Sequence, residues 1–184
     1  MRIALTGTPG TGKTSVSKIL IKNGIKVIDL NDLATSKNFV SGRDSKRKSK
    51  IIDTVKLNQY INKNFPANET IIFESHLSHL LKCMDKIIIL RCHPKELQKR
   101  LKTKGWNKEK IQENVEAEIL DVILVETTEI HKRENIFEIN TTNKKIIQIV
   151  EDIKQILNDK VNDYLIGRID WSEEVLKWYW KESV

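Results

Sequence analysis

RIALTGTPGTGKTSVSKIL, residues 2–20, combines three local patterns that decide the fold. Residues 2–6 form a mostly apolar run that ends at a glycine, which predicts a buried strand. Residues 7–14 are an intact G-x-x-x-x-G-K-T sequence, and apolar residues then recur at helical spacing over 16–20. Strand, glycine loop and helix in this order are typical of a phosphate-binding P-loop.

The residue types of this loop suit a nucleoside triphosphate. Glycines let the backbone curl so that its N–H groups converge on phosphate oxygens, and the positive end of the helix dipole adds to the attraction. Lys13 can reach the β- and γ-phosphates, and the Thr14 hydroxyl can bind Mg²⁺. We therefore expect ATP to bind at Gly7, Pro9, Gly10, Thr11, Gly12, Lys13, Thr14 and Ser15.

The rest of the chain alternates strand-like and helix-like segments. Short apolar runs predict further strands at 25–29, 70–74, 86–90 and 135–139, separated by helical patterns near 52–63, 94–103, 108–129 and 143–158. Asn107 can cap the helix that follows it, with Trp106 and Ile111 as a hydrophobic staple. This alternation predicts a three-layer α/β/α sandwich around a five-stranded parallel sheet, with residues 1–184 as one domain.

Length and composition agree with one globular domain. The chain has 184 residues, of which 39% are hydrophobic and 31% charged, and no apolar run approaches a membrane span. Two cysteines without metal spacing, and a start without the pattern of a signal peptide, favour a reduced cytoplasmic setting. The net charge of +7 favours anionic partners such as nucleotides or RNA, but a lysine-rich proteome gives the same bias.

A second motif follows the third predicted strand, where the sequence reads IIFESHLSHLL. Glu74 ends this strand, so its carboxylate should point toward the P-loop, where it can hold Mg²⁺ or orient an attacking group. His76 should lie beside the same phosphates. As a partly protonated donor it can stabilise the charge of the transferred group or position water. A purely structural role for His76 stays open, and His79 is expected to have no role in the reaction.

Basic residues over 91–104 form a third feature. Arg100 and Lys104 are four residues apart, so a helix places both on one face. Together with Arg91 at the end of a strand, they can clamp a phosphoryl group in transit. Residues 100–110 would then be a short lid; simple surface charge is the alternative, particularly for Lys104.

These motifs together resemble one family. GTPGTGKTS (7–15), ESH (74–76) and LKTKGWNKEKIQENVEAEILDVILVE (101–126) are similar to the adenylate kinase isoenzyme six family, an archaeal and eukaryotic nuclear group also called coilin-interacting nuclear ATPase. The resemblance runs from residue 1 to about 157. It implies a nucleoside monophosphate kinase-like fold, Mg²⁺-dependent phosphoryl transfer from ATP to AMP, slow ATP hydrolysis and a role in maturing the small ribosomal subunit and its RNA. The partner that it implies is the eleventh small-subunit ribosomal protein.

The resemblance assigns roles to individual residues. His76 matches the histidine of the family's acidic-x-His motif, which is tied to hydrolysis, and Arg100 matches the first basic residue of its short lid. Two positions depart from the pattern. Glu74 stands where aspartate is common, so its contact to Mg²⁺ is expected through water, and Lys104 stands where arginine is common. Lysine cannot make a bidentate fork to phosphate, so we expect weaker transfer.

In this fold the acceptor site lies between the second and third strands, roughly residues 30–66. Residues 43–50 carry five basic side chains, which favour a solvated mobile loop or, alternatively, contacts to AMP or RNA phosphates. Arg43 and Arg91 are the weak acceptor-site candidates. The loop 140–145 is expected to border adenine.

The C-terminal extension, 159–184, holds three of the four tryptophans. Ser172 can cap a helix with Trp171 and Leu176 as its staple. The aromatic residues either pack back onto the domain or remain exposed as a docking surface for a protein.

Three functions remain open on this evidence: an adenylate kinase, a ribosome-assembly ATPase with incidental kinase activity, and a P-loop kinase for another small metabolite. The first two use the same Lys13, Thr14 and Glu74, so the motifs do not separate them. Dependence of ATP turnover on a ribosomal partner would separate these two functions. The sequence carries no sign of the oligomeric state.

Overall fold

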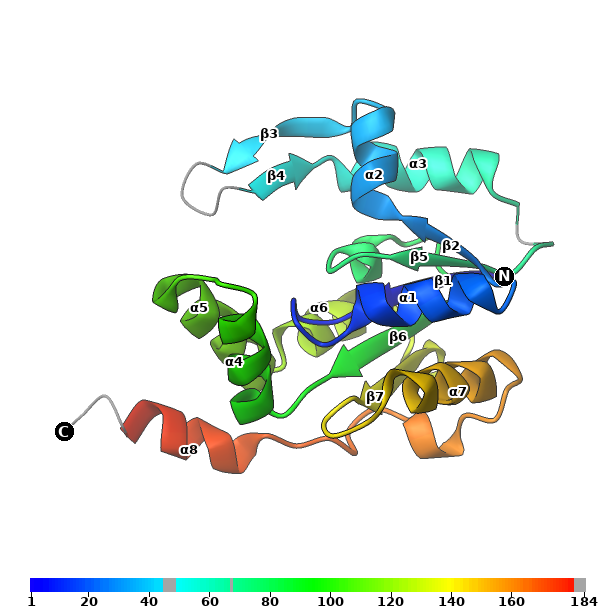
Figure 1. Ribbon diagram of the computed structural model, residues 1–184. Coiled ribbons are helices and arrows are strands. Elements are labelled where there is room, and N and C mark those ends of the chain that lie inside the picture. Colours follow the sequence, from blue (N-terminus) through cyan, green and yellow to red (C-terminus); the bar gives the residue numbers. More distant parts are fainter. Residues whose placement is uncertain (45–48, 67, 181–184) are drawn as a thin grey trace.

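The computed structural model describes residues 1–44, 49–66 and 68–180 (Figure 1). Its centre is a five-stranded sheet with the strand order β2-β5-β1-β6-β7. The strands are β1 (Arg2–Thr6), β2 (Lys26–Asp29), β5 (Ile71–Glu74), β6 (Lys86–Arg91) and β7 (Ile136–Asn140), and all neighbours pair in parallel. The five predicted strands are confirmed to within one residue at each end. Their apolar runs are continuous because both faces of a parallel sheet are buried.

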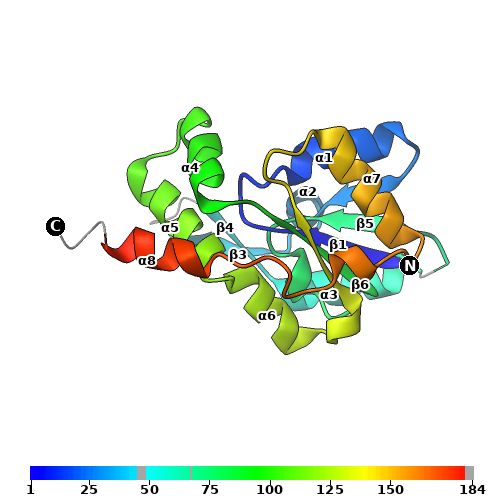
Figure 2. The same cartoon turned by 90° about the horizontal axis from the view of Figure 1, so that it is seen from below.

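Helices cover both faces of this sheet (Figure 2). Ile3 and Leu5 of β1 pack against helices α1 (Lys13–Lys22) and α7 (Ile146–Leu157). Ala4 faces the opposite way, toward α3 (Thr54–Asn64) and α6 (Val122–Ile130). This alternation follows from the two-residue period of a strand. The three-layer α/β/α sandwich is confirmed.

The predicted helix over 108–129 is wrong in one respect, because the chain breaks it in two. Helix α5 (Lys108–Ile119) ends before Asp121, whose φ of 54° lies in the left-handed region, and α6 follows. Aspartate tolerates this conformation better than most residues. At the other end of α5, Asn107 accepts a hydrogen bond from the Lys110 backbone N–H at 2.9 Å, so the predicted cap is confirmed.

The segment between β2 and β5 holds more regular structure than the sequence predicted. It contains α2 (Leu30–Ser36), α3 and an antiparallel hairpin of β3 (Val40–Asp44) and β4 (Ser49–Ile52). Figure 1 shows these elements beyond the edge strand β2. The charged residues of 43–50 hide the alternation that would reveal short strands. Residues 45–48 of the basic run lie outside the described part of the chain.

The C-terminal extension crosses the sandwich and ends in α8 (Ser172–Trp180). Leu165 makes an antiparallel bridge to Phe137 of β7, and Trp171 is 9% exposed. Packing of the extension is therefore confirmed at Trp171. The predicted staple is wrong, because Leu176 is 61% exposed and Trp171 stacks edge-to-face on His93 at 5.2 Å instead.

The remaining elements are α4 (Pro94–Thr103) and three short 3₁₀ turns at Ser78–Leu80, Arg133–Asn135 and Asn162–Tyr164. Within the described residues, no helix is long and apolar enough to cross a membrane.

Candidate active site

The P-loop lies at the carboxyl end of β1, and its glycines are required by geometry. Gly7 has a φ of 137°, and an added Cβ would lie 2.4 Å from the Leu90 backbone oxygen. Gly10 has a φ of 101°, and an added Cβ would lie 2.8 Å from the side chain of Leu97 in α4. The loop therefore passes too close to β6 and α4 for side chains at these positions.

Lys13 begins α1 and folds back over the loop. Its ammonium donates to the carbonyl oxygens of Gly7 at 2.6 Å and Thr8 at 3.3 Å. Burial lowers the pKa of Lys13 to about 8, although the carboxylate of Glu74 acts in the opposite direction. The cation is thus held, largely desolvated, where a phosphate chain would meet the loop.

This lowered pKa predicts a pH dependence of nucleotide binding. The charged ammonium binds an anionic phosphate better than the amine does, so ATP affinity should fall about tenfold per pH unit above about pH 8. Dissociation constants for ATP between pH 7 and 9.5 would show this break. Lys13→Arg, whose guanidinium stays charged, should remove it. An unchanged affinity up to pH 9.5 in the wild type would contradict the prediction.

Glu74 ends β5 beside the P-loop strand and is 6% exposed. Burial raises the pKa of its carboxyl group, while Lys13 and a hydrogen bond from the Thr14 hydroxyl lower it. Carboxylate and hydroxyl oxygens are ligands that Mg²⁺ accepts, commonly together with substrate phosphates and water. Thr14 and Glu74 therefore fit the predicted Mg²⁺ site.

A pocket of about 570 Å³ opens over these groups. It lies at the carboxyl ends of β1 and β5, where parallel sheets commonly bind ligands. Its wall gathers residues from the P-loop and the start of α1, from α2, from β5 and the turn after it, from the end of α4, and from α7 and the loop before it. They are Pro9, Gly10, Gly12, Lys13, Thr14, Ser15, Asn31, Glu74, His76, Arg100, Thr103, Lys104, Lys144, Ile146 and Ile149. Most of the predicted nucleotide-binding residues therefore share one pocket. Gly7 and Thr11 do not line it; Thr11 closes the loop by donating its hydroxyl to the Thr8 carbonyl at 2.9 Å.

His76 lies on the pocket wall but differs in charge from the prediction. The residue is exposed to solvent, but the protein atoms around its ring and the positive charge of Lys13 both disfavour a second cation and lower the pKa of His76 to about 4. At neutral pH the imidazole is neutral rather than partly protonated. It can still accept or donate one hydrogen bond to water.

His79 is buried and ordered by polar contacts away from the pocket wall. Its ring nitrogens lie 3.0 Å from the Thr6 hydroxyl and 2.9 Å from a carboxylate oxygen of Glu126. These contacts join the 3₁₀ turn Ser78–Leu80 to β1 and α6, which is a structural role.

Arg100 and Lys104 both reach the pocket, from the last turn of α4 and its C-cap. The Arg100 guanidinium donates to Glu96 at 3.2 Å and to the carbonyl of Thr141 at 3.0 Å. The segment predicted as a short lid is thus tied to the loop predicted to border adenine. That loop contributes Lys144 to the wall.

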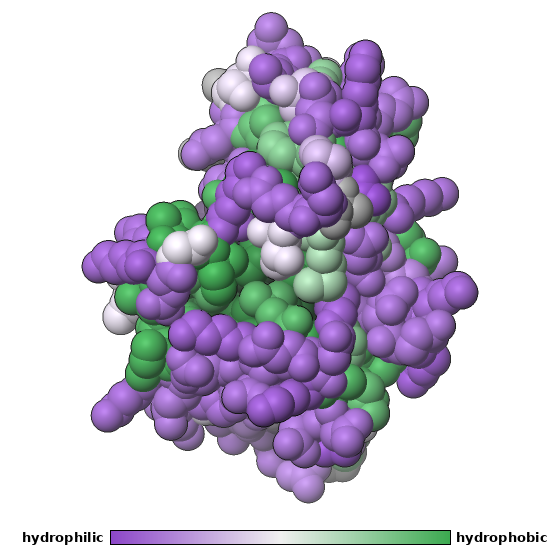
Figure 3. Space-filling view, turned by 90° about the vertical axis from the view of Figure 1, so that its right-hand side faces the viewer, coloured by the Kyte–Doolittle hydropathy of each residue, from purple (hydrophilic) through white to green (hydrophobic). Residues whose placement is uncertain are grey.

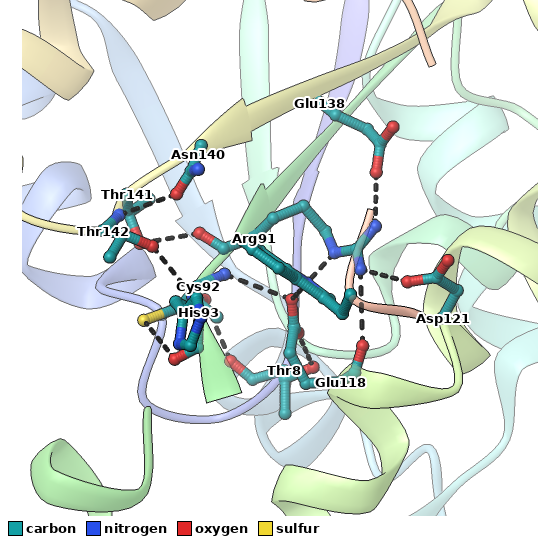
Figure 4. Close-up of polar contacts among 12 residues, drawn as sticks. Thr8, Arg91, Cys92, His93, Glu118, Asp121, Glu138, Asn140, Thr141 and Thr142 are labelled. Atoms are coloured by element: carbon teal, nitrogen blue, oxygen red, sulfur yellow. Dashed lines mark hydrogen bonds and ion pairs between the residues drawn. The ribbon is translucent and has the colours of Figure 1, made fainter. Parts of the chain in front are cut away.

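The structure corrects the role predicted for Arg91. Its side chain is 3% exposed and points away from the pocket into a cluster of three carboxylates, from Glu118, Asp121 and Glu138 (Figure 4). Burial alone would lower the pKa of Arg91, but these carboxylates outweigh it and raise the pKa. A clamp on a phosphoryl group does not fit this position, because Arg91 is buried, does not line the pocket and has its charge balanced by three carboxylates.

Arg43 lies in β3, but its side chain is outside what the structure describes, so its contact to an acceptor stays a prediction. The wall residues that sequence reasoning missed are Asn31, Thr103, Ile146 and Ile149. Asn31 follows the carboxyl end of β2, a position that could have indicated it.

The amino ends of the strands form the opposite end of the sheet, away from the P-loop and Glu74. Figure 3 shows a mainly hydrophilic face with hydrophobic side chains in a recess. A second pocket of about 400 Å³ lies there, beside the N-terminus, where Lys26 and Glu69 pair at 2.9 Å.

Comparison of the sequence with known proteins identifies related proteins. A family model described as an AAA domain matches residues 3–121. A protein of Methanocaldococcus jannaschii named "Putative adenylate kinase" is 40% identical over 175 residues, covering 95% of this chain and 94% of its own length. A protein of the same name from Methanosarcina barkeri is 44% identical over 185 residues, covering 95% of this chain and all of its own. The chain belongs to the family of these archaeal proteins named "Putative adenylate kinase".

A solved structure shares the fold of this chain. Shikimate kinase from Acinetobacter baumannii superimposes with a TM-score of 0.58 over 86% of this chain and 93% of its own, at 14% sequence identity. At this identity the likeness concerns the fold alone. In this chain, the fold brings the P-loop, Glu74 and the basic end of α4 to one pocket.

Proposed function

We propose that this chain is a cytoplasmic adenylate kinase, which transfers the γ-phosphoryl group of ATP to AMP and yields two ADP. One observation carries the proposal: P-loop backbone, Lys13, Glu74 and two basic side chains of α4 line the same pocket. The names of the archaeal relatives support it. Phosphoryl transfer needs positioning and charge stabilisation more than covalent chemistry, and these residues supply both.

Each group has a role that follows from its place. Lys13 would bind the β- and γ-phosphates, and Arg100 and Lys104 would stabilise charge on the group in transit. Thr14 and Glu74 would hold Mg²⁺, which would neutralise part of the negative charge of the phosphate groups. Arg100 is held in place by Glu96 and Thr141, so little ordering is needed before it can act.

The acceptor would enter from the side of residues 30–66. Asn31 of α2 lies on the pocket wall, and β2, which precedes it, pairs directly with β5 and Glu74. The hairpin β3–β4 and helix α3 extend this side of the molecule. In this proposal residues 30–66 bind AMP and residues 100–110 act as a short lid.

The test is a nucleotide balance. Purified protein would be incubated with ATP and Mg²⁺, with and without AMP, and the nucleotides and free phosphate would be quantified by chromatography and a phosphate assay. Two ADP formed per ATP consumed, only when AMP is present, would establish the proposal. ADP and free phosphate formed equally with and without AMP would reject it.

The second candidate is a ribosome-assembly ATPase. The neutral His76 on the pocket wall can orient a water molecule, and the net charge of +7 suits an RNA-bound assembly. Small-subunit ribosomal RNA and the eleventh small-subunit ribosomal protein are the partners to add to the same assay. Stimulation of phosphate release by either one, with no AMP-dependent ADP, would favour this candidate.

A further inference from the structure

Glu118 is a buried carboxylate of α5 that contacts the P-loop and β6, as Figure 4 shows, and also the C-terminal extension. It is 2% exposed. Its Oε1 accepts hydrogen bonds from Arg91 Nε at 2.8 Å, from the Cys92 backbone N–H at 3.1 Å and from Trp171 Nε1 at 3.3 Å. Its Oε2 accepts from the Thr8 hydroxyl at 2.5 Å.

Thr8 connects this carboxylate to the P-loop. The residue is 3% exposed, and its side chain points away from the nucleotide pocket toward α5. Its backbone carbonyl, however, accepts from the Thr11 hydroxyl at 2.9 Å and from the Lys13 ammonium at 3.3 Å. A change at the Thr8 side chain therefore reaches one of the two carbonyls that accept from Lys13.

The C-terminal extension meets the same carboxylate from the other side. The Trp171 indole N–H donates to Glu118, and the Gly167 backbone N–H donates to Glu138 at 3.0 Å. Both acceptors are partners of Arg91. The extension thus supplies two of the donors that this acidic cluster needs, since one guanidinium faces three carboxylates.

We propose that Glu118 is a positioning residue of the P-loop, that it acts through Thr8, and that Trp171 completes its hydrogen bonding. The C-terminal extension then sets the affinity of the P-loop for a nucleoside triphosphate. The inference rests on the triphosphate site of the proposed function, but not on the identity of the acceptor.

The test is a double-mutant cycle read out as the dissociation constant of ATP. Thr8→Val, which removes the buried hydroxyl donor, should weaken ATP binding about tenfold, the equivalent of about 1.4 kcal/mol. Thr8→Ser, which keeps the hydroxyl, should stay within about twofold of the wild type. Glu118→Gln should also cost about tenfold alone, but less than about twofold when added to Thr8→Val.

This pattern separates positioning from mere structural support. Independent losses that multiply to about a hundredfold would overturn the link through Thr8. Glu118→Gln also disturbs Arg91 and can fail to fold. In that case the ATP affinities of Thr8→Val and Thr8→Ser test the proposal. Equal affinities of Thr8→Val and wild type would overturn it.

A matched pair tests the C-terminal part. Trp171→Phe removes the indole donor to Glu118. Trp178→Phe removes a similar donor, 3.4 Å from Glu116, and within the described residues Glu116 makes no hydrogen bond to the P-loop. We expect about threefold weaker ATP binding for Trp171→Phe and no change for Trp178→Phe. Equal effects of the two changes would overturn the role of Trp171. Because ATP binding is measured without AMP, a chain that binds ATP but makes no ADP would reject the proposed kinase and leave this inference testable.

Discussion

Lys13→Ala should lower the rate of ADP formation from ATP and AMP by about 10³-fold, equivalent to about 4 kcal/mol of transition-state stabilisation. Lys13 is 8% exposed and its ammonium lies against the Gly7 and Thr8 carbonyls, so no water replaces it efficiently as a partner for phosphate. A positive charge attracts phosphate most strongly where water is excluded. The measurement is the steady-state rate at saturating ATP and AMP.

Lys22→Ala is the matched control, because Lys22 ends the same helix and is exposed. We expect its rate to equal that of the wild type. Thermal unfolding of both variants separates loss of function from loss of fold. A Lys13→Ala protein that folds and keeps more than about a tenth of the wild-type rate would contradict the assignment of Lys13.

Arg91→Leu should lower the free energy of unfolding by about 3–5 kcal/mol. It leaves the carboxylates of Glu118, Glu138 and Asp121 close together without their cation. Burial already raises the pKa of Glu138 and of Asp121, and loss of Arg91 would raise both further. Urea unfolding followed by circular dichroism measures the effect, with Arg133→Leu, an exposed arginine, as the control that should change stability by less than about 0.5 kcal/mol.

The pH dependence of this deficit has a definite sign. A carboxyl group whose pKa is raised in the folded state takes up its proton there first, so folding gains stability as the pH falls through that pKa. The difference in stability between wild type and Arg91→Leu should therefore shrink from pH 7 to pH 5. A variant with wild-type stability but slow phosphoryl transfer would restore the role in the reaction that the sequence suggested for Arg91.

Much of the candidate site could be read from local patterns. The order of strand, glycine loop and helix over residues 2–20 places Lys13 and Thr14, because these residues are close along the chain and their geometry depends on few neighbours. Glu74 was predictable for a similar reason, since a residue that ends a parallel strand beside the P-loop strand must lie at the same edge of the sheet. Continuous apolar runs located the five strands of the central sheet.

The environment of Arg91 was not predictable in this way. Its position at the end of β6 suggested a phosphate contact, but its partners stand 27, 30 and 47 residues away along the chain. The break at Asp121, which a helical pattern over 108–129 does not reveal, brings that carboxylate to the guanidinium. The charge of His76 likewise depends on how closely the surrounding protein excludes water.

By itself the sequence determined the P-loop, the parallel sheet and the acidic residue beside the loop, because each depends on spacing within one segment or on the order of segments. Only the tertiary structure decided which side chains meet: Arg91 with its three carboxylates, Thr8 with Glu118, and Trp171 with the same carboxylate. Such contacts join distant segments, and a buried charge or hydroxyl takes whichever partner the packing of those segments brings within reach.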